Sequence, residues 1–302
     1  MPHLLALAGI LIISFSAILV RLAGVSPSTA AFYRVVYAAP VLVAGWLATR
    51  RFDRRTGRER ALAAVAGLIL AADLTLWHTS IVFIGAGLST VLASTQVVIV
   101  GLAAWALHGE RPTRAAMALV PAVLTGVAMI SGLGRPDAYG ARPVAGTILA
   151  VLAGAAYASF LLVFRASNRS ASPPVGPLMD ATLGSVAGAA IIGPLLDPGF
   201  SLAVTWPAHG WLATLALAPH VTGWLLITAA LPRLPALETS VMLLGQPVLT
   251  VLWGLLVFGE WLSGVQWTGV ALVLAGVGWL GSRGSVEERA APSQPPPSRR
   301  RP

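Results

Sequence analysis

The sequence predicts an all-α integral membrane protein with about ten transmembrane helices in two inverted five-helix repeats. Three observations lead to this prediction. The 302-residue chain is 56% hydrophobic and 10% charged, with a mean hydropathy of +0.80, which leaves too little polar surface for a water-soluble protein of this size. Apolar runs of about 20 residues, long enough to cross a bilayer as a helix, recur along the chain. The second half of the chain also resembles the first half.

The apolar runs follow one another with short polar connections. Those of the first half cover residues 4–22, 29–48, 61–83, 86–108 and 113–132. Those of the second half cover residues 144–164, 175–196, 208–231, 237–258 and 262–281. They lack the alternation of polar and apolar residues that barrel strands show, so we interpret each as a helix. The first run has neither a basic residue before it nor a small-residue cleavage signal after it, which favours a retained helix over a signal peptide.

The charged residues orient these helices. All twenty Lys and Arg positions are arginines, and sixteen of them fall in cytoplasmic loops and tail if the N-terminus is cytoplasmic. This bias is strongest in residues 50–60 (RRFDRRTGRER), and it predicts a multi-pass protein of the cytoplasmic membrane with both termini in the cytoplasm. The net charge of +9 therefore reflects topology and not nucleic-acid binding. Residues 282–302 are rich in proline and charge, so we expect a disordered cytoplasmic tail.

An internal repeat divides the chain into two halves. At an offset of 150 residues, the segment 89–130 matches 239–280 without a gap, and Ser14-Phe15 in the first span corresponds to Ser159-Phe160 in the sixth. Each half holds five spans, and an odd number places the second copy upside down in the membrane. The predicted units are therefore residues 1–132, residues 144–281 and the tail. Inverted repeats are typical of alternating-access transporters.

Each half contains a Gly-Glu turn between its last two spans. In HGERPT and FGEWLS, the glycine can end one helix in a left-handed cap, and Thr113 or Ser263 can cap the next helix. Glu110 and Glu260 then lie just before a helix N-terminus, where the helix dipole favours a negative charge. We interpret both glutamates as parts of hairpin turns, and the alternative is a gating pair.

Two ionisable residues occupy equivalent positions in the two halves. At an offset of 147 residues, Asp73 in the third span aligns with His220 in the eighth, and Trp77 aligns with Trp224. Asp73 lies roughly 18 Å along its helix, near the middle of the membrane. A carboxylate there is expected to face the interior of the bundle, where water, a partner or a substrate can compensate it. We predict that these four residues bind substrate. The alternatives are a buried structural pair of Asp73 and His220, and packing or interfacial roles for the two tryptophans.

Amides and prolines extend this candidate site. Gln96 and Gln246 correspond in the repeat, and each amide can bond either a substrate or a neighbouring helix. Pro219 precedes His220 and Pro247 follows Gln246, so both prolines are predicted to interrupt their helices beside a polar residue.

Three further residues in the spans have chemistry to assign. His78 lies five residues after Asp73 and is predicted to line a different wall, while Tyr157, in the small-residue stretch GAAYASF, is a further lining residue. Arg34 in the second span is interpreted as structural, with its long stem reaching the outer headgroups, and the alternative is that it binds a substrate carboxylate.

The chain resembles the drug/metabolite transporter superfamily, specifically its ten-helix EamA-type group. Phe32-Tyr33-Arg34 and the two Gly-Glu turns carry this resemblance, which covers about residues 1–282. The resemblance implies a carrier with a central cavity lined by spans 1, 3, 4, 6, 8 and 9, with the second span away from it. It also implies export of amino acids or other small metabolites.

These observations favour a transporter over an enzyme. The sequence shows neither paired acids at metal-ligand spacing, nor a glycine-rich phosphate loop, nor a nucleophile elbow, so we expect no cofactor and no bound metal. The leading hypothesis is a secondary transporter that exports an amino acid, an aromatic compound or a cation. Coupling to protons would require the pKa of Asp73 or His220 to differ between the inward-facing and outward-facing states of the protein. The alternative is a non-transporting structural or sensory subunit of the membrane. Gly184–Gly188 (GSVAG) offers a close-packing surface, either within the chain or in a homodimer.

Overall fold

The computed structural model describes residues 2–96, 98–99, 114–131, 137–167, 173–230 and 245–290. Within these ranges all the regular elements are helices, which confirms the all-α prediction. Six of the described helices are long and apolar enough to cross a membrane, and shorter apolar helices accompany them. The first Gly-Glu turn, with Glu110, lies outside the described residues.

The helices follow the predicted spans closely, although two spans are divided. The described helices of the first half are α1 (Pro2–Ser14), α2 (Ser16–Ala23), α3 (Pro27–Thr49), η1 (Arg50–Phe52), α4 (Gly57–Ala93) and α6 (Arg114–Ile130). Those of the second half are α7 (Pro143–Ala166), α8 (Val175–Leu196), α9 (Ala208–Leu215), η2 (Ala216–Gly223), α10 (Trp224–Ala230), α12 (Gly245–Phe258) and α13 (Gly264–Ala290). The first span breaks between α1 and α2, and the eighth consists of α9, η2 and α10.

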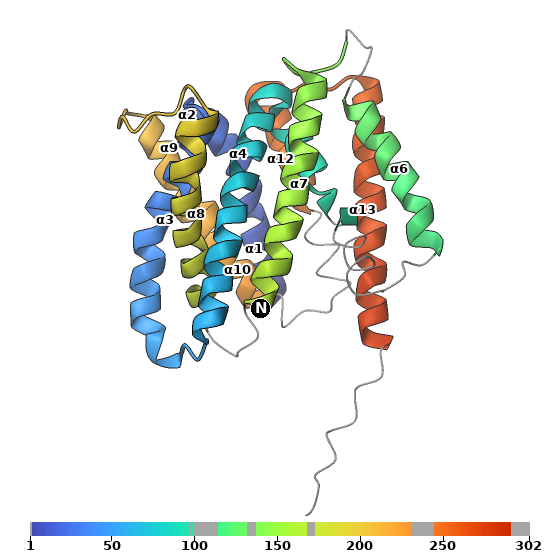
Figure 1. Cartoon of the computed structure of the whole chain (residues 1–302). Helices are drawn as coiled ribbons and strands as arrows, with labels where there is room; N and C mark the ends of the chain where they lie inside the picture. The colour runs from blue at the N-terminus through green and yellow to red at the C-terminus, as the bar shows by residue number, and fades with distance from the viewer. Residues whose placement is uncertain are drawn as a thin grey trace, which may run out of the picture.

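The long helices lie roughly side by side along one direction, as Figure 1 shows. The connection between α3 and α4 lies at the lower end of this view, and the connection between α12 and α13 lies at the upper end. We call these the α3–α4 end and the α12–α13 end. Helices that correspond in the sequence repeat run in opposite directions: α1 and α2 rise where α7 descends, and α3 descends where α8 rises.

Helix α4 contains a reversal of the chain at Gly85. The backbone of Gly85 has φ of 83°, a left-handed conformation that glycine adopts without strain. Beyond it the chain folds back on itself. Two hydrogen bonds cross the reversal: the Ser80 hydroxyl donates to the Ser89 hydroxyl at 2.8 Å, and the Ser89 hydroxyl donates to the carbonyl oxygen of Trp77 at 3.5 Å. The reversal confirms the predicted boundary between the third and fourth spans.

Local capping explains where several helices begin and end. The Ser26 hydroxyl accepts from the backbone N–H of Thr29 at the start of α3, and Pro27 occupies the first helical position. Thr56 and Glu59 form a capping box at the start of α4. Gly24, with φ of 62°, ends α2.

An ion-pair network joins three helices at the α3–α4 end. Arg55, whose side chain is 0% exposed, donates two hydrogen bonds to Asp53, at 2.9 and 2.8 Å. The same guanidinium lies 2.9 Å from Asp180 at the start of α8, and Arg60 of α4 lies 3.3 Å from Asp180. Trp46 of α3 donates to Asp53 at 2.9 Å. The network ties the arginine-rich connection to α8.

Small residues bring α4 and α8 into backbone contact. A Cβ at Gly184 would meet the carbonyl oxygen of Ala64, and a Cβ at Gly67 would meet that of Ala181. The Ser185 hydroxyl donates to the carbonyl oxygen of Gly67 at 2.8 Å across the same contact. The small-residue surface of α8 is therefore used within the chain.

The last helix extends beyond its predicted end. Helix α13 continues to Ala290, and so enters the segment that the sequence predicts to be disordered. Its final residues, SVEERA, include the strong helix formers glutamate, arginine and alanine, which lets the helix continue past the apolar span. Residues 291–302 lie outside the described residues.

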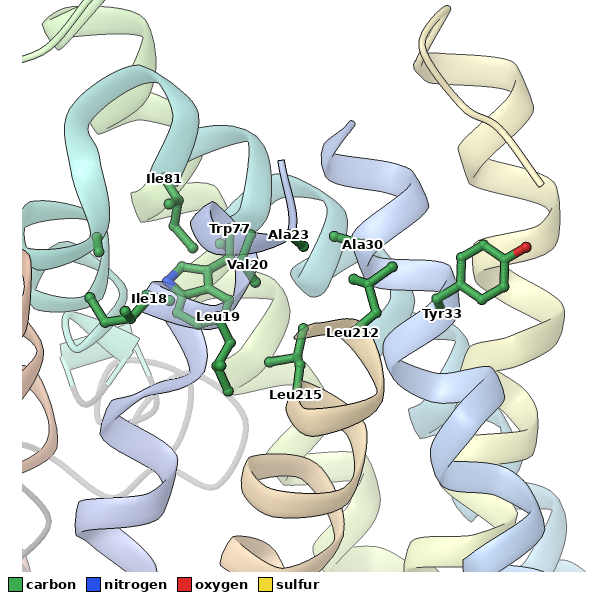
Figure 2. Packing of buried hydrophobic residues seen from close by; sticks show 13 residues of the cluster. Ile18, Leu19, Val20, Ala23, Ala30, Tyr33, Trp77, Ile81, Leu212 and Leu215 are labelled. Atoms are coloured by element: carbon green, nitrogen blue, oxygen red, sulfur yellow. The ribbon is translucent and has the colours of Figure 1, made fainter. Parts of the chain in front are cut away.

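A hydrophobic cluster packs the part of α4 around Trp77 and Ile81 against α2, α3 and α9. In Figure 2, Trp77 is drawn among Ile18, Leu19 and Val20, while Leu212 and Leu215 of α9 form another part of the cluster. The cluster continues through Ala30 to Tyr33 on α3. It places one face of α3 and one face of α4 beside each other, which positions the buried charges described next.

Candidate functional site

Arg34 lies at the centre of a buried polar cluster. It projects from α3, is 5% exposed, and donates from Nε to Nδ1 of His220 at 3.4 Å. Its guanidinium carbon lies 5.8 Å from the centre of the Trp77 ring. The expectation that Arg34 reaches the outer headgroups was wrong, because acceptors and an aromatic ring inside the bundle hold the side chain there.

His220 lies in the irregular part of the eighth span. Pro219 precedes it, and η2 is a π-helix, a form that often marks functional positions in membrane and soluble proteins alike. The Nε2 atom of His220 lies 3.2 Å from the hydroxyl oxygen of Thr182 on α8. Because Nδ1 accepts from Arg34, a neutral His220 carries its proton on Nε2 and donates to Thr182.

Asp73 is a buried acid that attracts Arg34 electrostatically. The acid is 7% exposed on α4 and is close enough to Arg34 for electrostatic attraction. Both ring nitrogens of His220 have other partners, so Asp73 and His220 are linked through Arg34 and not by a direct bond. The two residues that the repeat aligns are thus brought to one cluster by a residue on a third helix.

Aromatic side chains flank this cluster. Tyr157 of α7 interacts electrostatically with Asp73 and Arg34. Its ring lies 6.3 Å from that of Trp224 in an edge-to-face arrangement, and Phe160 lies 6.1 Å from the same Trp224 ring.

Trp77 and His78 of α4 also lie near Arg34. Trp77 is buried in the hydrophobic cluster, and its Nε1–H has no hydrogen-bond partner among the described residues. The ring of His78 lies 5.4 Å from that of Trp77, and Nδ1 of His78 is 3.2 Å from the carbonyl oxygen of Pro27. His78 therefore contacts the start of α3. It lies five residues, more than one helical turn, after Asp73.

The structure does not bring the two glutamines to this cluster. Gln96 follows the turn at the end of α4, beside Gly154 of α7, and its Oε1 is buried without a hydrogen-bond partner in the described part of the chain. Gln246 lies in the first turn of α12, where its carbonyl oxygen accepts from the Thr250 hydroxyl at 2.9 Å.

A break in the first span, which sequence reasoning missed, lies on the same side of the bundle as α12. Helix α1 ends at Ser14, whose carbonyl oxygen accepts from the Thr250 hydroxyl at 3.0 Å. Trp253 donates to the Ser14 hydroxyl at 2.9 Å and stacks on Phe15 at 4.8 Å. Broken helices whose backbone groups bond to neighbouring helices are common beside transporter sites.

The cluster contains a buried cation and a buried acid. Arg34 offers its Nη1 donor, which is buried and has no hydrogen-bond partner among the described residues, and Asp73 offers a carboxylate. In the described ranges, groups of three or more metal-ligating side chains are absent. The cluster therefore offers a hydrogen-bond donor and a carboxylate beside aromatic rings.

Comparison with known proteins gives three findings. The sequence model of the EamA-like transporter family matches residues 1–132 and 144–282. The "Uncharacterized transporter YwfM" of Bacillus subtilis (strain 168) is 24% identical over 253 residues, which are 82% of this chain and 81% of that protein. A solved structure, described only as the crystal structure of a protein, has a TM-score of 0.59 and 18% identity, and the match covers 95% of this chain and 98% of the other. The structural likeness shows the fold.

Proposed function

Because the chain belongs to the EamA-like transporter family, within the drug/metabolite transporter superfamily, we propose that it exports a small metabolite by alternating access. Family membership supports a multi-pass transporter that is embedded in the bilayer and acts on small-molecule substrates. The proposal adds the solute classes, which are amino acids, aromatic compounds and cations. It also places the protein in the cytoplasmic membrane with both termini in the cytoplasm, so that the α12–α13 end faces outside.

One observation carries the proposal: Arg34 is buried beside Asp73 with an unused donor. A buried donor without an acceptor costs about 1–3 kcal/mol, so a solute that supplies the acceptor recovers this free energy. A carboxylate fits Arg34 Nη1 and an ammonium fits Asp73, while Trp77, Tyr157 and Trp224 provide apolar and aromatic walls. These groups together favour an amino acid over a compound that carries only one charge.

Solute binding can be tested by thermal unfolding of the purified full chain. We propose to compare α-amino acids, aromatic amines and quaternary ammonium compounds, each at pH 5.5 and 7.5. The native protein, Asp73→Asn and Arg34→Lys are measured beside Arg60→Gln, which removes an ion pair outside the cluster. A ligand at one hundred times its Kd should stabilise the native protein by roughly 2.7 kcal/mol.

The outcomes separate the solute classes. An amino acid should stabilise the native protein and Arg60→Gln, and should lose most of this effect in both cluster variants. A simple cation should depend on Asp73 alone. A difference between the two pH values that Asp73→Asn abolishes would indicate coupling to protons.

The competing function is a structural or sensory subunit that moves no solute. In that case none of the solute classes would stabilise the native protein, and Asp73→Asn would only unfold at a lower temperature. A homodimer is a separate expectation that chemical crosslinking of the purified protein can test.

A further inference from the structure

The carboxylate of Glu260 closes the α12–α13 end of the molecule. Its side chain is 2% exposed, and its two oxygens accept from the backbone N–H groups of Ala86 and Gly87, at 2.8 and 3.0 Å. These donors belong to the helical turn that follows Gly85, so Glu260 caps the fourth span. The sequence led us to expect a glutamate that precedes its own helix, and the structure assigns it to a helix of the other half.

Glycines shape the space around this carboxylate. A Cβ at Gly85 would lie 2.7 Å from Cδ of Glu260, and a Cβ at Gly87 would lie 3.4 Å from Oε2. A Cβ at Gly254 of α12 would also meet Oε2. Gly259, with φ of 61°, turns the chain so that Glu260 enters this niche. Backbone atoms and glycines therefore surround the Glu260 carboxylate and fix its position.

Arg21 of α2 is the remaining partner, and it is held differently. Arg21 Nη1 forms an ion pair and hydrogen bond with Glu260 Oε1. The Arg21 side chain is 28% exposed, and its guanidinium lies 4.0 Å from the centre of the Phe258 ring. Tyr139, before α7, interacts electrostatically with both Arg21 and Glu260. Arg21 can turn toward water, whereas Glu260 keeps its two backbone donors.

We propose that the Arg21–Glu260 pair is a releasable lock that closes the α12–α13 end, and that its release lets the solute path open at this end. The pair connects the first predicted repeat to the second, across the end where α2, α4 and α12 meet. Alternating access requires a contact of this kind, which holds one end shut and breaks without unfolding either partner. The break between α1 and α2 lets the short α2 move while α1 stays in place. This inference rests on the proposed transport function.

Distances between spin labels test the lock without any solute. The chain contains no cysteine, so Leu22→Cys and Gly264→Cys place one label on α2 and one at the start of α13. Leu22 is exposed, and a Cβ at Gly264 meets nothing within 4 Å. Double electron–electron resonance is measured on the full chain in lipid nanodiscs, with Arg21→Gln, Arg21→Lys and Arg60→Gln added to the labelled pair.

The lock predicts a specific pattern. Arg21→Gln should add a second population with a distance longer by about 5 Å or more, the rise of one helical turn. Arg21→Lys keeps a cation and should resemble the parent protein, as should Arg60→Gln, which loses an ion pair at the opposite end. In the parent protein, raising NaCl from 0.1 to 1 M should also increase the longer population, because salt screens a partly exposed pair.

Two results would overturn the inference. One is a folded Arg21→Gln protein with the distances of the parent. The other is an Arg21→Gln protein that unfolds at a lower temperature, together with a parent whose distances do not change with salt, because the pair would then be structural. If the spin-label distances change as expected but none of the tested solutes binds, the inference about the Arg21–Glu260 pair stands. Only the proposed solute classes are then contradicted.

Discussion

Arg34 and Asp73 compensate each other in a buried setting, so removing one should cost more than removing both. A single Arg34→Gln or Asp73→Asn change leaves the other charge without compensation, for which about 3 kcal/mol of destabilisation is typical. The double variant removes both charges and should recover a large part of this loss. A double-mutant cycle on the free energy of unfolding measures the coupling. Additive effects would show that the two charges act independently.

Asp53 supplies a pH-dependent contribution to stability. Hydrogen bonds from Arg55, with a further one from Trp46, hold the pKa of the Asp53 carboxyl well below its usual range. Because the unfolded pKa is about 4, this contribution is present above that pH and is lost as the pH falls through the folded value.

We therefore expect Asp53→Asn to unfold at a lower temperature at pH 7, and to lose less stability on acidification than the native protein. Thermal unfolding between about pH 2 and pH 7 measures both effects, because the loss begins only below the unfolded pKa. Arg60→Gln, which changes a neighbouring pair while leaving Asp53 ionisable, is the control. Equal slopes for native protein and Asp53→Asn would contradict the assignment.

Two members of the buried polar cluster could be singled out from the sequence. Asp73 and His220 could be found because an ionisable residue in an apolar span is rare and because the repeat aligns them. Arg34 could not be assigned in the same way, since periodicity does not say which way a long side chain turns, and acceptors on two other helices decide this. A buried basic residue one span away from a buried acid was the available signal.

The reversal of α4 favours glycine at position 85 for two physical reasons. Its φ of 83° is unfavourable for a residue with a Cβ, and that Cβ would collide with the Glu260 carboxylate. Gly85→Ala should therefore destabilise the protein by about 1–3 kcal/mol. Gly57→Ala is the matched control, because a Cβ there meets nothing within 4 Å. Similar unfolding temperatures for the two variants would contradict the role given to Gly85.

Two irregularities in the described part of the first half differ in how well the sequence reveals them. The reversal at Gly85 falls where two apolar runs meet, so a boundary was predicted there. The break at Phe15 has neither proline nor glycine beside it and depends on Thr250 and Trp253, which are more than 230 residues away. Tertiary partners decide such a break, and local propensity cannot predict it.

At the scale of the whole molecule, the two ends are tied by different means. The α3–α4 end is held by Arg55, whose buried guanidinium faces both Asp53 and Asp180. The α12–α13 end is held by Glu260, with the partly exposed Arg21 as its partner. The ion pair at the α12–α13 end includes a cation that is 28% exposed, whereas the Arg55 side chain at the other end is 0% exposed, and this difference favours release of the Arg21–Glu260 pair.

Which end faces the cytoplasm decides what that release accomplishes, and single cysteines can determine it. Gly57→Cys lies at the α3–α4 end and Gly264→Cys at the α12–α13 end; neither Cβ has a neighbour within 4 Å, and the chain has no cysteine of its own. In intact cells a membrane-impermeant maleimide should label Gly264→Cys, while Gly57→Cys should react only after permeabilisation, because the arginine-rich connection is retained in the cytoplasm. The reverse pattern would place the Arg21–Glu260 pair inside the cell, where its opening would admit solute for export and not release it.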